Sequence, residues 1–184
     1  MQFNPLHNHR ILLVDDNLAI HRDFRKILST FSDLTDNLEK REKALFGVTN
    51  RNSKSPIFEI DSAYQGQEGL DRIKQSLLEG RPYAMAFVDV RMPPGWDGVE
   101  TTCKIWQQYP DLQVVLCTAY SDYSWEEMVK PLGFLDRIVV LKKPFDNIEV
   151  LQLAVALTEK WRLNQMSKLR VDNLEKLIES DRLR

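Results

Sequence analysis

The chain has 184 residues, of which 43% are hydrophobic and 28% charged, and its formal net charge is -2. This length allows one globular domain and an additional segment, and the balanced charge disfavours nucleic acid and membrane surfaces as partners. No apolar run approaches the ~20 residues that cross a bilayer, and the N-terminus lacks the apolar region of a signal peptide, so we expect a cytoplasmic protein.

The first predicted strand covers residues 10–16, reads RILLVDD and ends in two adjacent aspartates, Asp15 and Asp16. Asn17 can cap the helix that follows. Apolar residues recur in this helix at spacings of three and four, which is typical of one buried face: Ile20, Phe24, Ile27, Leu28 and Phe31. His21 lies between them, with no second histidine or cysteine at ligand spacing nearby. We therefore expect His21 at the surface or at the boundary of the core, and not on a metal.

Residues 33–56 are predicted to be an insertion between this helix and the second strand. A short helix that Gly47 ends could open the insertion, and TNRNSKSP is typical of a loop. The second strand is expected at residues 57–63, where IFEIDSA alternates in character. A helix over residues 66–79 follows, with an apolar face of leucine and isoleucine and with Gly80 at its end.

The stretch from Tyr83 to Gly98, YAMAFVDVRMPPGWDG, carries the third strand. Its apolar run is bounded by proline and glycine, which is typical of a buried parallel strand, and Asp89 stands at the carboxyl end. In open α/β sheets, ligands bind in the crevice at that end. Asp97 is expected to cap the next helix, which Pro110 ends.

The remaining elements continue the alternation of strand and helix. The fourth strand is expected at residues 112–118 and ends in Thr118. A helix from residue 121 or 122 to about residue 133 follows it. The fifth strand, residues 137–144, ends in the sequence LKKP, and a final helix begins near residue 146 and runs toward the end of the chain.

This alternation predicts an α/β fold, a doubly wound five-stranded parallel sheet with helices on both faces and an extended C-terminal helix. The carboxyl ends of parallel strands share one edge, which brings together five polar residues: Asp15, Asp16, Asp89, Thr118 and Lys143. Three neighbouring carboxylates repel one another and persist only with a cation or protons. Oxygen ligands without histidine or cysteine favour Mg²⁺, and an aspartate can attack a phosphoryl group.

Four motifs in this order, ILLVDD, FVDVRMPPGWDG, VVLCTA and LKKPF, resemble those of the receiver domain of response regulators in two-component signalling. The resemblance spans about residues 10–157 apart from the insertion. It implies a flavodoxin-like (βα)5 fold and a phosphorelay switch rather than an enzyme that turns over a substrate. The partner would be a cognate sensor histidine kinase or a phosphotransfer protein.

The resemblance also implies which residues take the phosphoryl group and the metal. Asp89 would be the phosphoacceptor. Asp16 and Asp89, together with the backbone carbonyl of Arg91, would bind Mg²⁺. Asp15 would hold a metal-bound water.

Two further residues would hold the phosphoryl group by the same resemblance. Thr118 would hydrogen-bond to it, and Lys143 would pair with it. Lys143 is preferred to Lys142 because the lysine of the family directly precedes a proline, here Pro144, across a bond that is usually cis. Val140 stands where many members carry an aromatic switch residue, which disfavours an aromatic-flip mechanism here.

The loop after Asp89 has one residue more than is usual in the family, Pro94 or Gly95. Three further stretches and the insertion resemble receivers at the N-terminus of larger signalling proteins: SAYQGQEGL, AYSDYSWEEM and KKPFDNIEVLQLAVALTEKWRL. Those proteins carry histidine kinase or GGDEF-type output domains. The resemblance implies that the partner of the receiver domain in signalling is an output domain of either type.

Residues 1–157 are expected to form the receiver domain and residues 158–184 a helical linker. The linker is charged, and its apolar residues recur at imperfect spacings of three to four: Trp161, Leu163, Met166, Leu169, Leu174, Leu177 and Ile178. Two interpretations remain open. One is a solvated helical tail, and the other is a parallel coiled coil that pairs two copies into a homodimer.

Two other functions use similar residues. A Mg²⁺-dependent phosphohydrolase of the haloacid dehalogenase type also needs a strand-end aspartate, a threonine and a lysine, but it requires a second aspartate where this chain has Arg91. A flavodoxin-like cofactor binder would need a phosphate loop rich in serine, threonine or glycine after the first strand. At that position the chain instead has the acidic sequence DDNLAI.

Overall fold

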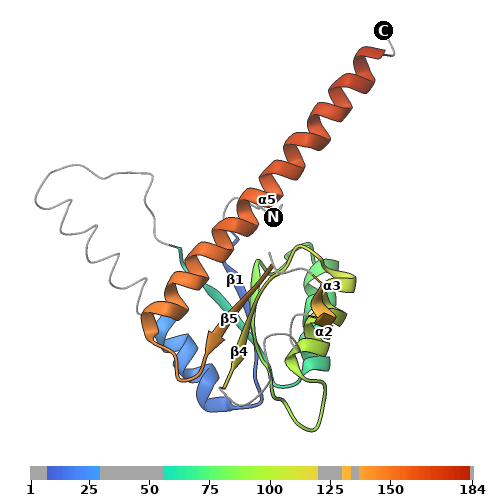
Figure 1. The fold of residues 1–184 in the computed structure, drawn as a ribbon. Helices are drawn as coiled ribbons and strands as arrows, with labels where there is room; N and C mark the ends of the chain where they lie inside the picture. Colours follow the sequence, from blue (N-terminus) through green and yellow to red (C-terminus); the bar gives the residue numbers. More distant parts are fainter. Residues whose placement is uncertain (1–7, 30–55, 120–129, 134–136, 183–184) are drawn as a thin grey trace, which may run out of the picture.

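The computed structural model describes residues 8–29, 56–119, 130–133 and 137–182, which form a parallel sheet with helices on both faces (Figure 1). The strands of this sheet are β1 Arg10–Val14, β2 Glu59–Ala63, β3 Met85–Asp89, β4 Gln113–Thr118 and β5 Ile138–Lys142. Their spatial order is β2-β1-β3-β4-β5, and all neighbouring strands are parallel. This order is the flavodoxin-like one, so the predicted fold class is confirmed.

The helices are a first helix over residues 18–29, α2 Gly66–Leu78, α3 Gly98–Gln108 and α5 Asn147–Arg182. Of the helix expected before β5, residues 121–129 lie outside the described residues, and residues 130–132 are helical. Residues 33–55 of the expected insertion and Phe31 of the first predicted helix also lie outside the described residues. The strands are one or two residues shorter at one or both ends than the sequence predicts, and Asp15, Asp16 and Lys143 lie just beyond the carboxyl ends of β1 and β5.

The alternation of side chains along each strand divides the core into two layers. Leu12 and Val14 of β1 face the cluster that α2 and α3 cover, whereas Ile11 and Leu13 face the first helix and α5. Figure 1 shows α2 and α3 on one side of the sheet and α5 on the other. Every residue of β1, β3 and β4 is buried, as expected for central strands of a parallel sheet.

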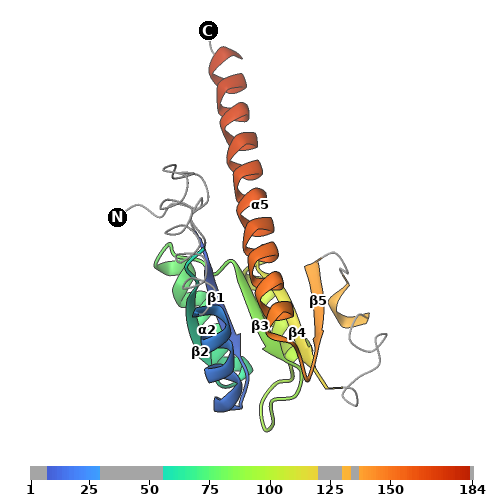
Figure 2. The ribbon, with the colours of Figure 1, turned by 90° about the vertical axis from the view of Figure 1, so that its left-hand side faces the viewer.

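The last helix continues well past the sheet. In Figure 2, α5 packs along the sheet with its first turns and then projects away from it. One stripe of α5 is buried at spacings of four, three and four residues: Val150, Ala154, Leu157 and Trp161. Beyond this stripe most apolar side chains are exposed, including Leu174 at 59%, while Met166 is half-buried. No helix of the described chain is both long and apolar enough to cross a membrane.

Polar contacts hold α5 against the segment that joins α3 to β4. Trp161 Nε1 donates a hydrogen bond to the Tyr109 hydroxyl over 2.7 Å, and both side chains are buried. Gln165 and Lys168 lie one and two turns further along α5, and Gln165 Nε2 and Lys168 Nζ both donate to the carboxylate of Asp111, at 3.0 and 2.6 Å. The expected boundary at residue 157 therefore falls inside a helix whose contacts with the sheet domain continue to Lys168.

The ion pair of Asp111 leads to a prediction about stability. Burial raises the pKa of Asp111, but hydrogen bonds from Lys168 and Gln165 outweigh it and hold the pKa below the ordinary 3.8. A carboxyl group with a lowered folded pKa stabilises the fold above its unfolded pKa and loses this effect as pH falls through the folded pKa. We expect Asp111→Asn to cost about 0.2–1 kcal/mol at pH 7, since the pair is partly exposed.

Urea denaturation over a pH series measures this effect. The difference between Asp111→Asn and the wild type should be constant at neutral pH and should shrink below pH 3.8. Asp172→Asn, on the exposed part of α5, is the matched control and should show neither effect. A pH-independent loss in Asp111→Asn would mean that the charge of Asp111 does not contribute.

Candidate phosphoryl and metal site

Two strand-end carboxylates and one lysine meet at the carboxyl edge of the sheet. Lys143 follows β5, and its Nζ lies 2.9 Å from Asp15 Oδ2 and 2.7 Å from Asp89 Oδ1. Asp89 ends β3, and Asp15 directly follows β1, which is the neighbour of β3. The side chains of Asp15 and Asp89 are 7% and 10% exposed, so this lysine bridges two nearly buried carboxylates.

Asp16 completes an acidic cluster that suits a hard cation. One carboxylate oxygen from each of Asp15, Asp16 and Asp89 lies within 4.8 Å of the others. Three carboxylates and the Lys143 ammonium leave an excess of two negative charges in this group. An all-oxygen donor set with that excess fits Mg²⁺, which binds through one or two carboxylates and keeps several waters. Asp16 is exposed, so water can enter on its side.

Burial and ion pairing have opposing effects on the pKa values of Asp89 and Lys143. Burial raises the pKa of Asp89, and the neighbouring carboxylates of Asp15 and Asp16 add to this, while Lys143 opposes it without cancelling it. Burial alone would lower the pKa of Lys143, but its bonds to Asp89 and Asp15 raise the pKa overall. The lysine therefore stays a cation at neutral pH, and the acids favour any additional positive charge.

The backbone beyond Asp89 is arranged so that the next helix comes very close to it. A Cβ atom on Gly98 would lie 2.3 Å from the carbonyl oxygen of Asp89, so only glycine fits at this position. Gly98 N donates to Val90 O over 2.9 Å and closes the loop. Asp97 caps α3 as predicted, since its side chain accepts a hydrogen bond from Glu100 N over 2.7 Å.

The additional residue of this loop is accommodated in a turn. The turn covers residues 93–95, the bond between Pro93 and Pro94 is cis, and Gly95 N donates to Met92 O over 3.1 Å. Gln65, at the start of α2, donates to Pro93 O over 3.3 Å. The longer loop thus contacts the start of α2, and Gly98 still packs against the backbone of Asp89.

The other expected site residues lie at the same edge with different contacts. Thr118 ends β4 and is buried, and its hydroxyl donates to the Ala119 carbonyl over 3.0 Å. Arg91 follows Asp89 by two residues and has an exposed side chain. Lys142 is also exposed, whereas its neighbour Lys143 reaches both carboxylates. The peptide bond between Lys143 and Pro144 is cis.

His21 is a correction to the sequence analysis. It was expected at the surface or at the core boundary, but it is buried, with 3% of its surface exposed. Its Nε2 lies 2.7 Å from the carbonyl oxygen of Asp15, and its Nδ1 lies 2.9 Å from Ser62 Oγ. His21 stands three residues before Phe24 and seven before Leu28. On a helix this spacing places it on the same buried face as these two residues. This spacing was the available signal.

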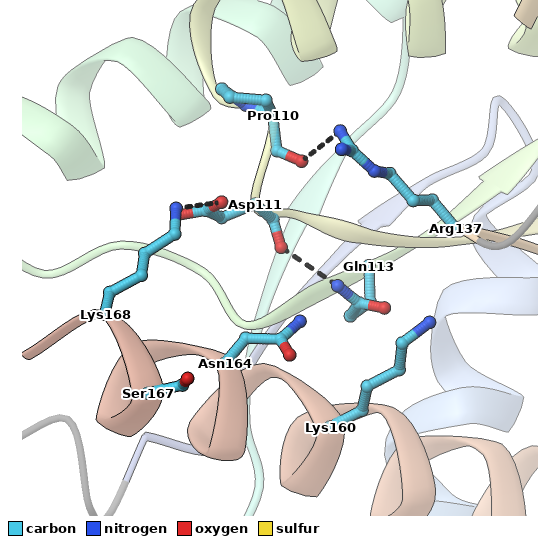
Figure 3. Close-up of a pocket in the computed structure, with 8 residues that line it drawn as sticks. All are labelled: Pro110, Asp111, Gln113, Arg137, Lys160, Asn164, Ser167 and Lys168. Carbon is cyan, nitrogen blue, oxygen red and sulfur yellow. Dashed lines mark hydrogen bonds and ion pairs between the residues drawn. The ribbon is translucent and has the colours of Figure 1, made fainter. Parts of the chain in front are cut away.

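A separate cavity of about 370 Å³ lies where α5 leaves the sheet (Figure 3). Gln113, the first residue of β4, and Asp111 line it from the domain, and Lys160 and Lys168 line it from α5. The cavity is at the amino end of β4, whereas Thr118 marks the carboxyl end. It is therefore distinct from the acidic cluster, and it marks the place where the Asp111 contacts hold α5.

Comparison with protein families gives a match to the response regulator receiver domain over residues 39–155. The match includes Asp89, Thr118 and Lys143, and it begins after Asp15 and Asp16. The placement of the two N-terminal acids beside Asp89 therefore rests on the structure, which pairs β1 with β3. No curated protein matches the chain.

Several solved structures share the fold. The adenylate cyclase from Rhodopirellula baltica is 23% identical with a TM-score of 0.61 and covers 90% of this chain and 98% of its own. A CheY-like receiver domain from Methanospirillum hungatei JF-1 is 21% identical with a TM-score of 0.59, over 84% of this chain and 97% of its own. NtrX from Brucella abortus is 20% identical with a TM-score of 0.60, over 86% of this chain and 28% of its own.

Proposed function

Because the chain belongs to the response regulator receiver family, we propose that it is a signalling switch in which Asp89 accepts a phosphoryl group in the presence of Mg²⁺. The observation that carries the proposal is the arrangement around Asp89, whose Oδ1 lies 2.7 Å from Lys143 Nζ beside two further carboxylates. A buried nucleophile, a fixed cation and an acidic metal-binding cluster are the groups that phosphoryl transfer uses.

In the proposed reaction a carboxylate oxygen of Asp89 attacks the phosphorus of the donor. The new bond is the Asp89 oxygen to phosphorus bond, and the bond from phosphorus to the donor breaks. With acetyl phosphate the electron pair of that bond leaves on acetate, and no net proton is consumed. Lys143 pairs with the negative phosphoryl oxygens, and the Thr118 hydroxyl can turn from the Ala119 carbonyl to donate to them.

Asp15, Asp16, Asp89 and the carbonyl of Arg91 are the groups proposed to hold Mg²⁺. The cation would neutralise charge on the donor and the acids and would orient the phosphoryl oxygens. Lys143 alone leaves two negative charges uncompensated in the cluster, which is why we propose that a divalent cation is required.

We expect Mg²⁺ to stabilise the unmodified protein. Binding to the native state alone adds about 2.7 kcal/mol at 100 times Kd. Asp16→Asn removes one acid of the cluster and should weaken the dependence of Tm on Mg²⁺, while Asp23→Asn, an exposed acid of the first helix, should leave it unchanged. Differential scanning fluorimetry over a MgCl₂ series measures this, and a wild-type Tm that ignores Mg²⁺ would argue against the metal site.

One assay separates this proposal from the two alternatives. The purified chain should be colourless, should take up one hydroxylamine-labile phosphoryl group from acetyl phosphate in MgCl₂, and should not turn over p-nitrophenyl phosphate. A bound chromophore would favour the cofactor binder. Sustained hydrolysis of the phosphomonoester would favour the phosphohydrolase, although Arg91 stands where that class needs an aspartate.

The partner of such a switch is a sensor histidine kinase or a phosphotransfer protein. We also propose that α5 carries the signal to a downstream output domain of the histidine kinase or GGDEF type. The helix is continuous from Asn147 to Arg182, and the domain holds it as far as Lys168. A displacement of the part of α5 that packs on the sheet would therefore also displace the C-terminal end of the helix.

We further propose that the projecting part of α5 pairs two copies of the chain. Leu174 and Ile178 stand four residues apart and are 59% and 56% exposed. We expect the wild type with beryllofluoride to sediment as a dimer and Leu174→Gln with Ile178→Gln to remain monomeric. Glu175→Gln with Glu179→Gln, at the same spacing on the same helix, is the control. A wild type that stays monomeric with and without beryllofluoride would leave the solvated-tail interpretation.

A further inference from the structure

His21 joins two elements to the backbone of the acidic cluster. It lies on the first helix and contacts Ser62 of β2 with Nδ1 and the Asp15 carbonyl with Nε2. Arg25, one turn further along the helix, donates from Nη2 to Ser62 Oγ over 2.8 Å. The three side chains form a chain of hydrogen bonds that ends at the peptide between Asp15 and Asp16.

The direction of these bonds follows from their partners. A carbonyl oxygen only accepts, so His21 Nε2 carries a proton and donates it to Asp15. An arginine only donates, so Ser62 Oγ accepts from Arg25, and its own proton is available to His21 Nδ1. Both ring nitrogens of His21 and the Ser62 hydroxyl therefore have a partner of the right kind, which fixes the orientation of the imidazole ring.

Every polar group of Asp15 is held by a different part of the protein. Its N–H donates to Ala63 O over 3.2 Å, and its carbonyl accepts from His21 over 2.7 Å. Its Oδ1 accepts from Asn17 N over 2.8 Å, and its Oδ2 accepts from Lys143 over 2.9 Å. The His21 bond is the one that holds the peptide plane leading to Asp16, because the Asp15 carbonyl and the Asp16 nitrogen share that plane.

We infer that His21 is a positioning residue for the Mg²⁺ site, which it serves by fixing the peptide that sets Asp16 relative to Asp15 and Asp89. The inference rests on the proposed function. Asp16 is exposed and follows the end of β1, so the ladder does not hold it. A group that orients metal-binding residues by hydrogen bonds contributes to the affinity for the metal without contacting the ion. Its removal commonly weakens metal binding about 10- to 100-fold.

The test compares four full-length proteins by isothermal titration with MgCl₂. His21→Leu removes the donor and should weaken Mg²⁺ binding about 10-fold or more. His21→Gln keeps an N–H near the Nε2 position and should restore most of the affinity. Leu28→Ala, a buried residue of the same helix that has no part in the Asp15 contacts, should destabilise the fold but bind Mg²⁺ as the wild type does.

A second measurement needs no metal. The Asn17 amide donates to Asp15 Oδ1, so its hydrogen exchange in metal-free protein should be faster in His21→Leu than in Leu28→Ala. Wild-type affinity for Mg²⁺ in His21→Leu would overturn the inference, and so would equal losses in His21→Leu, His21→Gln and Leu28→Ala. A wild type that binds no Mg²⁺ would overturn the proposed function and this inference with it. The wild-type titration therefore tells the two failures apart.

Discussion

Asp89→Asn is expected to abolish phosphoryl uptake from acetyl phosphate in MgCl₂. The amide cannot act as the nucleophile, while its size and its hydrogen bonding to Lys143 are nearly retained, so the fold should persist. Asp71→Asn makes the same chemical change on the exposed face of α2 and should be labelled like the wild type. Phosphate incorporation with a radiolabelled donor measures both.

The stability of Asp89→Asn adds an independent check. Burial raises the pKa of Asp89, so the ionised side chain opposes folding at neutral pH, and the amide should relieve this cost in the absence of Mg²⁺. The sign follows from linkage, since a carboxyl group with a raised folded pKa loses stability as pH rises from the unfolded pKa through the folded one. Residual labelling of a well-folded Asp89→Asn would show that another residue accepts the group.

Trp161→Ala is expected to have the largest effect on stability. The side chain is 1% exposed and is among the largest fully buried ones in the described chain. Truncating a buried aromatic to alanine typically costs about 3–5 kcal/mol, because the cavity closes only in part. Here the change also removes the donor to the Tyr109 hydroxyl. Urea denaturation should show this loss.

Two further variants show whether the loss of stability in Trp161→Ala comes from the contacts of this side chain with the domain. Tyr109→Phe removes only the acceptor of the Trp161 bond and should cost about 1–3 kcal/mol. Leu163→Ala truncates a neighbouring apolar residue of α5 that is 53% exposed and should cost little. If Trp161→Ala were as mild as Leu163→Ala, α5 would not be held by the domain past residue 157.

The convergence of Asp15, Asp89 and Lys143 was predictable from the sequence. Each follows or ends a short apolar run, and in a parallel sheet the ends of such runs share one edge. The Asp97 cap was also predictable, because an aspartate directly before a segment with helical periodicity can accept a hydrogen bond from the first turn of that helix. These features depend on order along the chain and on spacing alone.

The attachments of α5 and His21 were not predictable in the same way. Trp161 was grouped with the apolar residues of a linker, yet it extends the buried stripe of Val150, Ala154 and Leu157 at the same spacing. Its partner Tyr109 is 52 residues away. The bond from His21 to the Asp15 carbonyl crosses from helix to strand end, and only the packing of the first helix on the sheet brings them together.

The residue that carries the phosphoryl group in the wild type tests the account most directly. The full chain is treated with acetyl phosphate with MgCl₂ or with EDTA, the acyl phosphate is reduced with borohydride, and the modified residue is located by mass spectrometry of peptides. The account predicts modification of Asp89 in MgCl₂ and none in EDTA. Modification of Asp15 or Asp16, or equal labelling without the metal, would contradict it.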